Sequence, residues 1–596
     1  MSKSIEELAN IVVETDYLIV GGGVVGATSA IRAKNNNPNL DITIIDKAKL
    51  EWSGDGVGLD NFNQVPLHKE DINREVSEED AKKAIFGAKR LQGLQNLKLD
   101  AKQMKNAFIS QSVLEDVGVR IREDDGTLYV LQAYRTGVNW GRVEYDEDGK
   151  PCEPLFGSFS RASDLKQKLG AAVRKGGTKV LDRTMLTSIV TRDGVAVGVT
   201  AINTRTNEFL FIKAKAILLS TGFASRVYVH PSSPYPNNLF YSLTAAVNHG
   251  GGQACAFDAG AKLYSMEMGN FYNVSKGINH SSGGGGCNWY YRMYNSKGES
   301  LEAKYPEKMV TKAGGRTPGI NYLFSPDIAN AEVFNDVILS YKDKADNDLV
   351  SAVYFTAVTE PTKALKFHKL AGGLTNEPPS ECTFLQSGIG QAGGGVFRET
   401  LDSETSIQNL FAAGGVTGVS GSAGFTWACL VADHVTEMVK GKELPKIDGD
   451  QLQQIEAARS WVFAPLGRKA DYVVNPLELE DYIRHLIYNY VGVFKYTSKM
   501  QRALDLLKRA ELGAVPLLTA NSPHELMRVI EVQHILEIAQ LHVQSSLLRD
   551  ESRIVPVHFR IEYPELNDEK WFNKIVTVKK INGEAKYEIE KLNKDM

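Results

Sequence analysis

A glycine-rich turn between an apolar strand and a helix, close to the start of the chain, constrains the fold more than any other feature. Residues 17–20 (YLIV) are apolar, glycines stand at positions 21, 23 and 26, and residues 27–37 have helical character. Glycines at this spacing permit a tight turn, let the backbone approach a pyrophosphate, and let the helix pack closely on the strand. The pattern predicts the first half of a Rossmann-like α/β unit.

The next apolar run supports the same interpretation. Residues 42–45 (ITII) end at Asp46, whose carboxylate can accept a hydrogen bond from a ribose hydroxyl. A glycine turn without a ligand is the alternative. The strand, the helix and the acid around the turn favour a dinucleotide site with its phosphates at the helix N-terminus.

Two later glycine clusters indicate which dinucleotide binds. They follow apolar runs at 218–222 (LLSTG) and 410–415 (LFAAGG), and each returns to glycine after a long insertion. An NAD-binding unit would complete its sheet within the next hundred residues. Repeated returns to one sheet are similar to the two-dinucleotide-domain flavoproteins and favour a flavin coenzyme.

Composition narrows the function classes. The 596 residues are 43% hydrophobic and 23% charged, which predicts several globular domains and excludes global disorder. A net charge of −4 gives no electrostatic footprint for nucleic acid or an anionic membrane surface, but it leaves room for a local basic pocket and an anionic substrate.

The cysteine content and the lengths of the apolar segments indicate the cellular compartment of the protein. Five cysteines without a CxxC pair argue against a disulfide framework and against a cysteine-ligated iron–sulfur cluster in this chain. No apolar stretch reaches the length of a membrane span, and the first residues lack the pattern of a signal peptide. We therefore expect a cytoplasmic protein.

The pattern of apolar runs, glycines and helical segments predicts three domains. A Rossmann-like FAD-binding domain is expected from two segments, 1–228 and 372–446, with an inserted α+β capping or substrate domain at 229–371. A C-terminal helical domain follows at 447–596, and Asn582-Gly583 near its end predicts a hairpin turn.

Further motifs are spread along the whole chain. They are GGGVVGATSA (21–30), IIDKA (44–48), WSGDGVGLDNFN (52–63), LLSTGFAS (218–225), GAKLYSMEMGNF (260–271) and YNSKGE (294–299). Together they resemble the fumarate reductase/succinate dehydrogenase flavoprotein superfamily. The stretch 547–571, with HELMR at 524–528, is more similar to the alpha subunit of adenylylsulfate reductase.

The resemblance implies FAD as the cofactor. It is expected to bind without a covalent link, because 52–63 lacks the histidine that quinone-linked relatives use, and His68 falls outside that segment. The residues that we expect to line the cofactor are Gly21, Gly23, Val25, Gly26, Asp46, Lys47, Ser53, Gly222, Gly414, Gly415, Ser422, Gly424 and Thr426.

The catalytic residues of the family are not matched. In 418–426 (GVSGSAGFT), serine stands where the family has a histidine and glycine where it has an arginine. Cys287 occupies the place of a second arginine, counted back from Glu299, and the turn 385–394 (LQSGIGQAGG) lacks the expected histidine. Hydride transfer to fumarate or succinate by the usual residues is therefore not expected.

Other side chains in the inserted region are candidates for substrate chemistry. Arg292 and Arg316 could clamp a carboxylate or a phosphate, and His280 and His368 could handle protons. Solvated arginines and structural histidines are the competing interpretation of each. The spacing of His534 and His542 does not predict a metal site, and we expect none.

These observations support three hypotheses. The first is an FAD-dependent oxidoreductase that acts on a small, polar and anionic substrate, is oligomeric, and exchanges electrons with a small, separate iron–sulfur (ferredoxin-like) subunit. The second is the adenylylsulfate reductase alpha subunit, which interconverts adenylylsulfate with AMP plus sulfite. The third is a flavin-binding subunit of a larger complex that has lost its catalytic residues.

Overall fold

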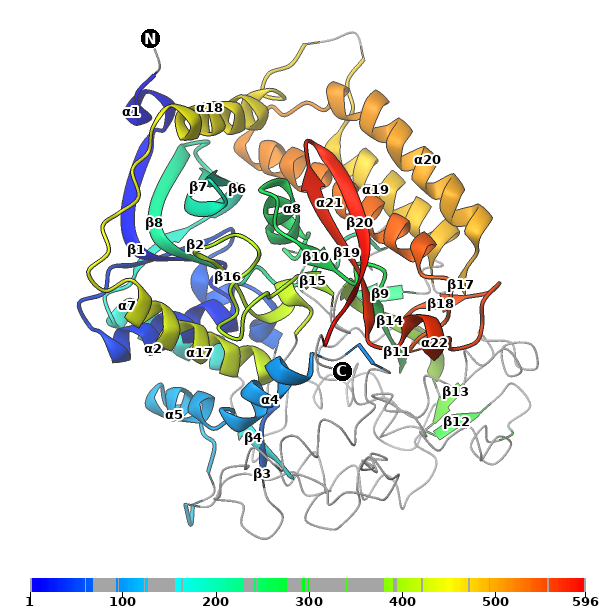
Figure 1. Cartoon of the computed structure of the whole chain (residues 1–596), viewed down its shortest axis with the longest axis horizontal. Coiled ribbons are helices and arrows are strands. Elements are labelled where there is room, and N and C mark those ends of the chain that lie inside the picture. Colours follow the sequence, from blue (N-terminus) through cyan, green and yellow to red (C-terminus); the bar gives the residue numbers. More distant parts are fainter. Residues whose placement is uncertain are drawn as a thin grey trace.

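The computed structural model (Figure 1) describes most of the chain outside the predicted capping domain. The described residues are 3–58, 61–67, 93–126, 156–161, 164–228, 240–242, 245–275, 292–294, 299, 338–340, 380–389 and 394–593, without 95, 123, 246, 420–421, 470–471, 493 and 555–556. Of the predicted insertion at 229–371, these ranges include residues 245–275, with one helix, and a few short strands, so its boundaries stay a prediction.

A seven-stranded sheet forms the centre of the molecule. Its order is β5-β2-β1-β8-β7-β6, and β16 pairs with β8 as well. The strands are β1 (Ile11–Val20), β2 (Ile42–Asp46), β5 (Lys179–Asp182), β6 (Thr184–Arg192), β7 (Val195–Asn203), β8 (Phe209–Leu219) and β16 (Leu410–Ala412).

Strand β8 carries two different partners along one edge. Its first half pairs antiparallel with β7, and its end, 217–219, pairs parallel with β16. Its other edge pairs parallel with β1. The segment at 410–412 therefore joins the sheet begun by the first strands, as the glycine clusters predicted.

Alternating side chains of the central strands enter two hydrophobic cores. Tyr17 and Ile19 face a core with α2 (Val24–Asn36), α7 (Leu165–Lys175) and α17 (Ser422–Met438). Leu18 and Val20 face a second core that includes α8 (Gly251–Asp258) and the C-terminal helices. Both faces of the sheet are thus covered, which is typical of a parallel α/β sheet.

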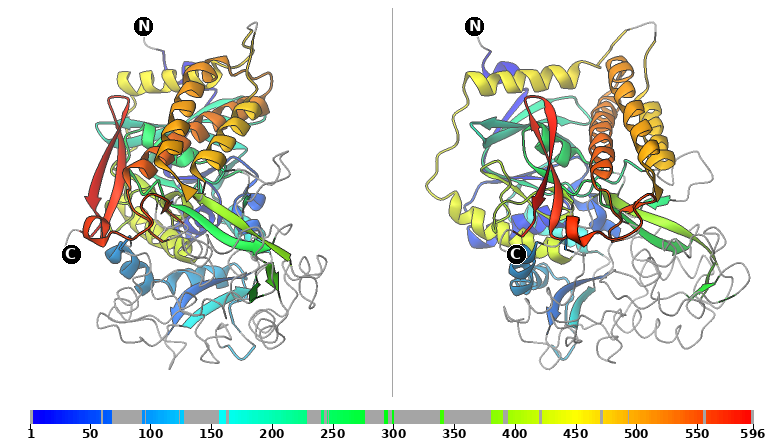
Figure 2. Two further views of the ribbon diagram at one scale, coloured as in Figure 1. Left: turned by 90° about the vertical axis from the view of Figure 1, so that its right-hand side faces the viewer. Right: turned by 45° about the vertical axis from the view of Figure 1, so that its right-hand side comes forward.

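The C-terminal part is mostly helical, as predicted. Its helices are α18 (Gly449–Phe463), α19 (Pro476–Leu486), α20 (Thr497–Gly513), α21 (Pro523–Leu548) and α22 (Asp568–Trp571). Three of them, α19, α20 and α21, stand side by side and range from yellow-orange to red-orange in Figure 2. The short strands β17 (Phe494–Lys495) and β18 (Phe559–Arg560) pair with each other near the lower end of these helices in Figure 1.

The chain ends in the predicted hairpin. Strands β19 (Lys574–Ile581) and β20 (Glu584–Lys591) flank Asn582 and Gly583, both with positive φ, at 51° and 81°. Such angles are those of a tight hairpin turn. The hairpin joins β10 (Leu263–Tyr264) and β15 (Gly395–Val396) in a second sheet, which ties the end of the chain to its middle.

The remaining described helices and strands complete the structure. They are α1 (Ile5–Leu8), β3 (Asn61–Leu67), α4 (Leu97–Lys105), α5 (Ile109–Asp116), β4 (Phe156–Arg161), β9 (Phe240–Ser242), β11 (Gly269–Ser275), β12 (Arg292–Tyr294), β13 (Ile338–Ser340) and β14 (Ser380–Ile389), with α1 packed near α18. Strands β9 and β11 to β14 form a third sheet.

Candidate functional site

The three glycine clusters meet at the carboxyl ends of β1, β8 and β16. A Cβ atom on Gly26 would collide with the carbonyl oxygen of Gly21 and lie 2.8 Å from Ser220 Oγ. A Cβ atom on Gly414 would lie 2.8 Å from Val25 Cγ2. Backbones approach this closely only where side chains are absent. We call Gly21, Gly23, Gly26, Gly414 and Gly424 the glycine cradle.

The N-terminus of α2 opens into free space within this cradle. Gly23 is the N-cap residue, and no side chain of the described residues caps the helix. An added Cβ on Gly23 would have no described atom within 4 Å. The first amide groups of the helix are therefore available to an anion, and the missing side chain leaves room for it. This geometry fits the pyrophosphate of a dinucleotide.

Asp46 lies at the end of β2, beside the turn. Its Oδ2 accepts a hydrogen bond from the Gly22 N–H and its Oδ1 accepts one from the Ala48 N–H, both at 2.7 Å. Burial raises the pKa of this carboxyl group, and the hydroxyl of buried Ser53 acts against that shift. A carboxylate has further lone pairs, so Asp46 can still accept a bond from a ribose hydroxyl.

The sequence did not reveal Lys166, a lysine of α7 buried beneath the turn. Its Nζ donates to the carbonyl oxygen of Gly22 at 2.7 Å and also to that of Leu50. Burial lowers its pKa to about 8, against the opposing charge of Asp46. The ammonium group thus fixes the backbone of the turn from below. The sequence does not distinguish a buried lysine on an amphipathic helix from an exposed one.

Lys47 points away from the turn towards the C-terminal helices. Its Nζ lies 2.5 Å from Glu531 Oε1, 2.9 Å from His249 Nδ1 and 2.7 Å from the carbonyl oxygen of Val247. Burial lowers the pKa of this lysine, and Glu531 opposes the change. A cofactor contact by its side chain remains a prediction.

Glu531 of α21 belongs to a larger buried ion network. Its Oε2 accepts from Arg226 at 2.6 Å, and Arg226 also binds both oxygens of Glu480 at 2.9 and 2.6 Å. Arg484 and Arg528 extend the network on its outer side. It connects the residue after Asp46 with α19 and α21. We refer to these six residues, Lys47, Arg226, Glu480, Arg484, Arg528 and Glu531, as the ion network.

The second glycine cluster lies against Asn248, whose partner is a carboxylate that the sequence did not single out. Gly222 has a φ of 80°, and an added Cβ would lie 3.0 Å from Asn248 Oδ1. The amide of Asn248 donates to both oxygens of Asp55, at 3.2 and 3.1 Å. Burial raises the pKa of Asp55 to about 6. The hydrogen-bonded pair of Asn248 and Asp55 therefore lies beside Gly222, a predicted cofactor contact.

The third cluster places glycines around Val25. Gly424 would bring a Cβ to 3.0 Å from Val25 Cγ2, and Gly415 would bring one to 3.0 Å from the ring of Phe223. The hydroxyl of Thr426, in the first turns of α17, is buried and has no hydrogen-bond partner among the described residues. Ser422 is the first residue of α17. An unpartnered buried hydroxyl beside the cradle suits a polar ligand atom.

The predicted catalytic residues are not brought together by the described structure. His280, Cys287, Arg316 and His368 lie outside the described residues. Arg292 is placed by its backbone in β12, opposite Ser340 of β13. Their roles therefore remain predictions.

The described part of the chain holds no group of three or more His, Cys, Asp or Glu side chains that could bind a metal ion. His534 and His542 are buried in the core, and His534 stacks on His249 with ring centres 5.5 Å apart. Among the helices that are described, we find none with the length and apolar character needed to cross a membrane.

Comparison with known proteins agrees with this site. Residues 16–284 match the family "FAD binding domain", and residues 480–596 match "Fumarate reductase flavoprotein C-term". An uncharacterized FAD-dependent oxidoreductase of Methanocaldococcus jannaschii is 23% identical over 95% of this chain and 97% of its own length. The fumarate reductase flavoprotein subunit of Helicobacter pylori is 24% identical over 94% of this chain and 82% of its own.

A solved structure shows the same fold. Adenylylsulfate reductase of Archaeoglobus fulgidus superposes with a TM-score of 0.73 at 20% identity, over 98% of this chain and 96% of that one. The converged glycine clusters, the open helix N-terminus and the two family matches agree with one another. This chain is an FAD-dependent oxidoreductase that belongs to the fumarate reductase/succinate dehydrogenase flavoprotein superfamily.

Proposed function

We propose that this chain transfers electrons between FAD and a small, polar, anionic substrate, and exchanges them with a separate iron–sulfur protein. The glycine cradle is the observation that carries the proposal, because it combines an open helix N-terminus with closely approaching glycine backbones. When bound, FAD supplies the acceptance or release of a hydride.

The described residues have distinct roles in holding that cofactor. The amides at the start of α2 bind the pyrophosphate beside Gly23, and Asp46 accepts from the ribose. Lys166 keeps the turn in place through the Gly22 carbonyl. Thr426 offers its hydroxyl from the first turns of α17. All of these groups orient the cofactor and none of them needs to change its protonation during turnover.

For the substrate, we propose recognition by basic residues of the inserted region. Arg292 and Arg316 are suited to bind a carboxylate or another oxyanion in a bidentate manner. His280 and His368 are suited to move a proton. A charge of −4 for the whole chain does not oppose this, because a local pocket decides which ion binds.

For electron exchange, we propose a second polypeptide. Five cysteines without a CxxC pair do not provide the usual ligands of an iron–sulfur cluster in this chain. The Helicobacter pylori relative is named a flavoprotein subunit, which supports an assembly of more than one chain. The partner would be a small ferredoxin-like protein, and the complex would be oligomeric and cytoplasmic.

Adenylylsulfate reductase activity is the second candidate. The fold similarity to that enzyme extends over 98% of this chain, and the C-terminal stretch 547–571 resembles its alpha subunit. The altered turn at 385–394 argues against it.

The decisive experiment is anaerobic reduction of the bound flavin. Purified protein is mixed with succinate, with other small carboxylates, and with AMP plus sulfite, and the flavin absorbance is followed. Bleaching by a carboxylate alone supports the first proposal, and bleaching only when AMP and sulfite are both present supports the second. A flavin that dithionite reduces but no substrate of the panel reduces would contradict both and favour a subunit without catalysis. Acid precipitation should release all the flavin, because we expect no covalent link.

A further inference from the structure

Two buried basic side chains face each other on β17 and β18, in a part of the molecule that the proposed function does not use. The strands run parallel, and Lys495 is the direct partner of Arg560. Side chains at paired positions emerge on the same face of a sheet. Lys495 is 0% exposed and Arg560 is 1% exposed. Two positive charges are therefore enclosed side by side.

Arg560 contacts mainly neutral groups. Its guanidinium donates to the carbonyl oxygens of Ser546 and Arg549 at 2.9 and 2.8 Å, and to the Thr497 hydroxyl at 2.6 Å. The carboxylate of Glu562 is 3.9 Å away and partly exposed, and Nε has no hydrogen-bond partner in the described part of the chain. An arginine does not lose its proton in a protein, so its charge persists.

Lys495 has fewer hydrogen-bond partners than Arg560. Its Nζ is buried and, within the described residues, has no hydrogen-bond partner. Burial, and then the charge of Arg560, lower its pKa to about 7. A buried ammonium group without a partner is costly, so either a proton leaves or an anion arrives.

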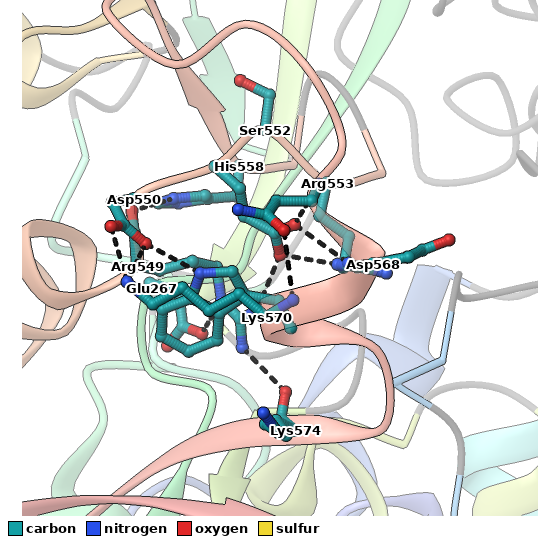
Figure 3. Close-up of polar contacts among 12 residues, drawn as sticks. Glu267, Arg549, Asp550, Ser552, Arg553, His558, Asp568, Lys570 and Lys574 are labelled. Carbon is teal, nitrogen blue, oxygen red and sulfur yellow. Dashed lines mark hydrogen bonds and ion pairs between the residues drawn. The ribbon is translucent and has the colours of Figure 1, made fainter.

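The acids of this region are already engaged (Figure 3). Arg549 binds Glu267 at 2.7 Å and Glu551 at 2.9 Å, and Arg553 binds Glu551 at 2.6 Å. Asp568 pairs with Arg553 and has a side chain 55% exposed. Four buried cations (Lys495, Arg549, Arg553 and Arg560) thus face two fully buried carboxylates (Glu267 and Glu551). Negative charge is in deficit beside Lys495.

Several polar atoms nearby also lack partners. Burial lowers the pKa of His558, so its ring is neutral, and its Nε2 donates to the carbonyl oxygen of Arg549 at 3.3 Å. Its Nδ1 is then an acceptor, and no described residue bonds to it. The hydroxyls of Ser545 and Ser546 and one oxygen of Glu267 are likewise unpartnered among the described residues. The serine hydroxyls can donate to an anion, whereas Nδ1 and the carboxylate oxygen can only accept hydrogen bonds.

We propose that Lys495 and Arg560 bind a small oxyanion of the carboxylate, phosphate or sulfate type. The anion supplies the missing negative charge and accepts hydrogen bonds from Lys495 Nζ and Arg560 Nε. Lys495 lies on β17 and Arg560 on β18, so the bound ion would help to hold these two short strands together.

The first test needs no variant. Flavin-loaded, full-length protein is exchanged exhaustively into chloride buffer and denatured with acid, and the released anions are separated by ion chromatography. We expect one oxyanion per chain, and its identity separates an inorganic ion from a small carboxylate. Absence of any stoichiometric oxyanion, together with no response in the second test, would overturn the proposal and indicate a neutral Lys495.

The second test compares thermal unfolding in sodium phosphate, sulfate or acetate with sodium chloride at equal ionic strength. Phosphate and sulfate stabilise proteins in general, so only the difference between variants is informative. A specific ligand stabilises in proportion to the logarithm of its concentration. We expect the shift of wild type and of Lys442→Met, an exposed control, to exceed that of Lys495→Met. Equal shifts in all three would contradict a specific site. If Lys495→Met does not fold, Lys495→Arg replaces it and should keep the shift.

Discussion

The glycine cradle and the ion network lie on either side of the residue pair Asp46–Lys47, yet they are built from opposite kinds of side chain. The cradle relies on missing side chains and on backbone amides, so that a charged ligand can come close. The ion network has long charged side chains that form direct ion pairs with one another. The first region is open for a partner and the second is closed. An open site should lose affinity when altered, whereas a closed one should lose stability.

The largest effect is expected in the closed region, from Arg226→Met. The change removes the arginine that binds both buried acids, Glu480 and Glu531, and breaking such a buried pair costs roughly 3–5 kcal/mol. Chemical unfolding of the flavin-loaded protein measures the loss. Arg174→Met is the control, because Arg174 is 39% exposed and pairs with Glu51 and Asp182 at the surface. Its cost should be at most about 1 kcal/mol. Equal losses would show that the network adds nothing to stability.

Two glycine substitutions test the open region. Gly26→Ala forces a methyl group into the Gly21 carbonyl oxygen, so α2 must shift, at a cost of roughly 1–3 kcal/mol and with loss of flavin. Gly23→Ala meets no described atom within 4 Å, so we expect the apoprotein to keep its stability and only its FAD affinity to fall. Unfolding of both apoproteins and their flavin content check this contrast. It fails if Gly23→Ala unfolds as readily as Gly26→Ala.

Lys166→Met should weaken cofactor binding by a smaller amount. The methionine fills a similar volume but leaves the carbonyl oxygens of Gly22 and Leu50 without a donor. We expect FAD affinity to fall about tenfold, equivalent to ~1.4 kcal/mol. Fluorescence titration of the apoprotein measures it. Lys168→Met, a more exposed lysine on the same helix, should leave the affinity unchanged. An unaltered affinity in Lys166→Met would exclude a role for the lysine in shaping the turn.

The last effect concerns the pH dependence of stability. Asp55 has a pKa raised from 3.8 to about 6 in the folded protein, so the folded state holds more protons than the unfolded state between those values. Stability falls as pH rises wherever the folded state binds more protons, so the free energy of unfolding should decrease from about pH 4 to about pH 6. Asp55→Asn cannot titrate and should remove that part of the slope. Parallel slopes in the two apoproteins would contradict the assignment.

The sequence predicted the parts of the molecule that depend on local signals. The turn at 21–26 and the hairpin at Asn582-Gly583 are confirmed, because glycine and asparagine mark positions with unusual backbone angles. The joining of 410–412 to the first sheet was also predicted, because an apolar run that ends in glycines is typical of a strand in such a sheet.

The buried charged residues that support the glycine turn and form the ion network could not be predicted from the sequence. Lys166 contacts a carbonyl group 144 residues away, and Arg226 meets Glu531 at a separation of 305 residues. Nothing in a charged residue's neighbours along the chain says which distant acid it will meet. The substrate side remains a prediction, because its candidate residues lie in the insertion and outside the described residues, or in β12 with only the backbone described.

The double partnership of β8 determines when a nascent chain can acquire its coenzyme. Among the described residues that follow β8, only 410–412 pair with 217–219, and Gly414 and Thr426 come after them in the chain. An unpaired strand edge is the kind of surface that favours faulty association. Truncated products that end before this point should therefore emerge colourless and prone to aggregate.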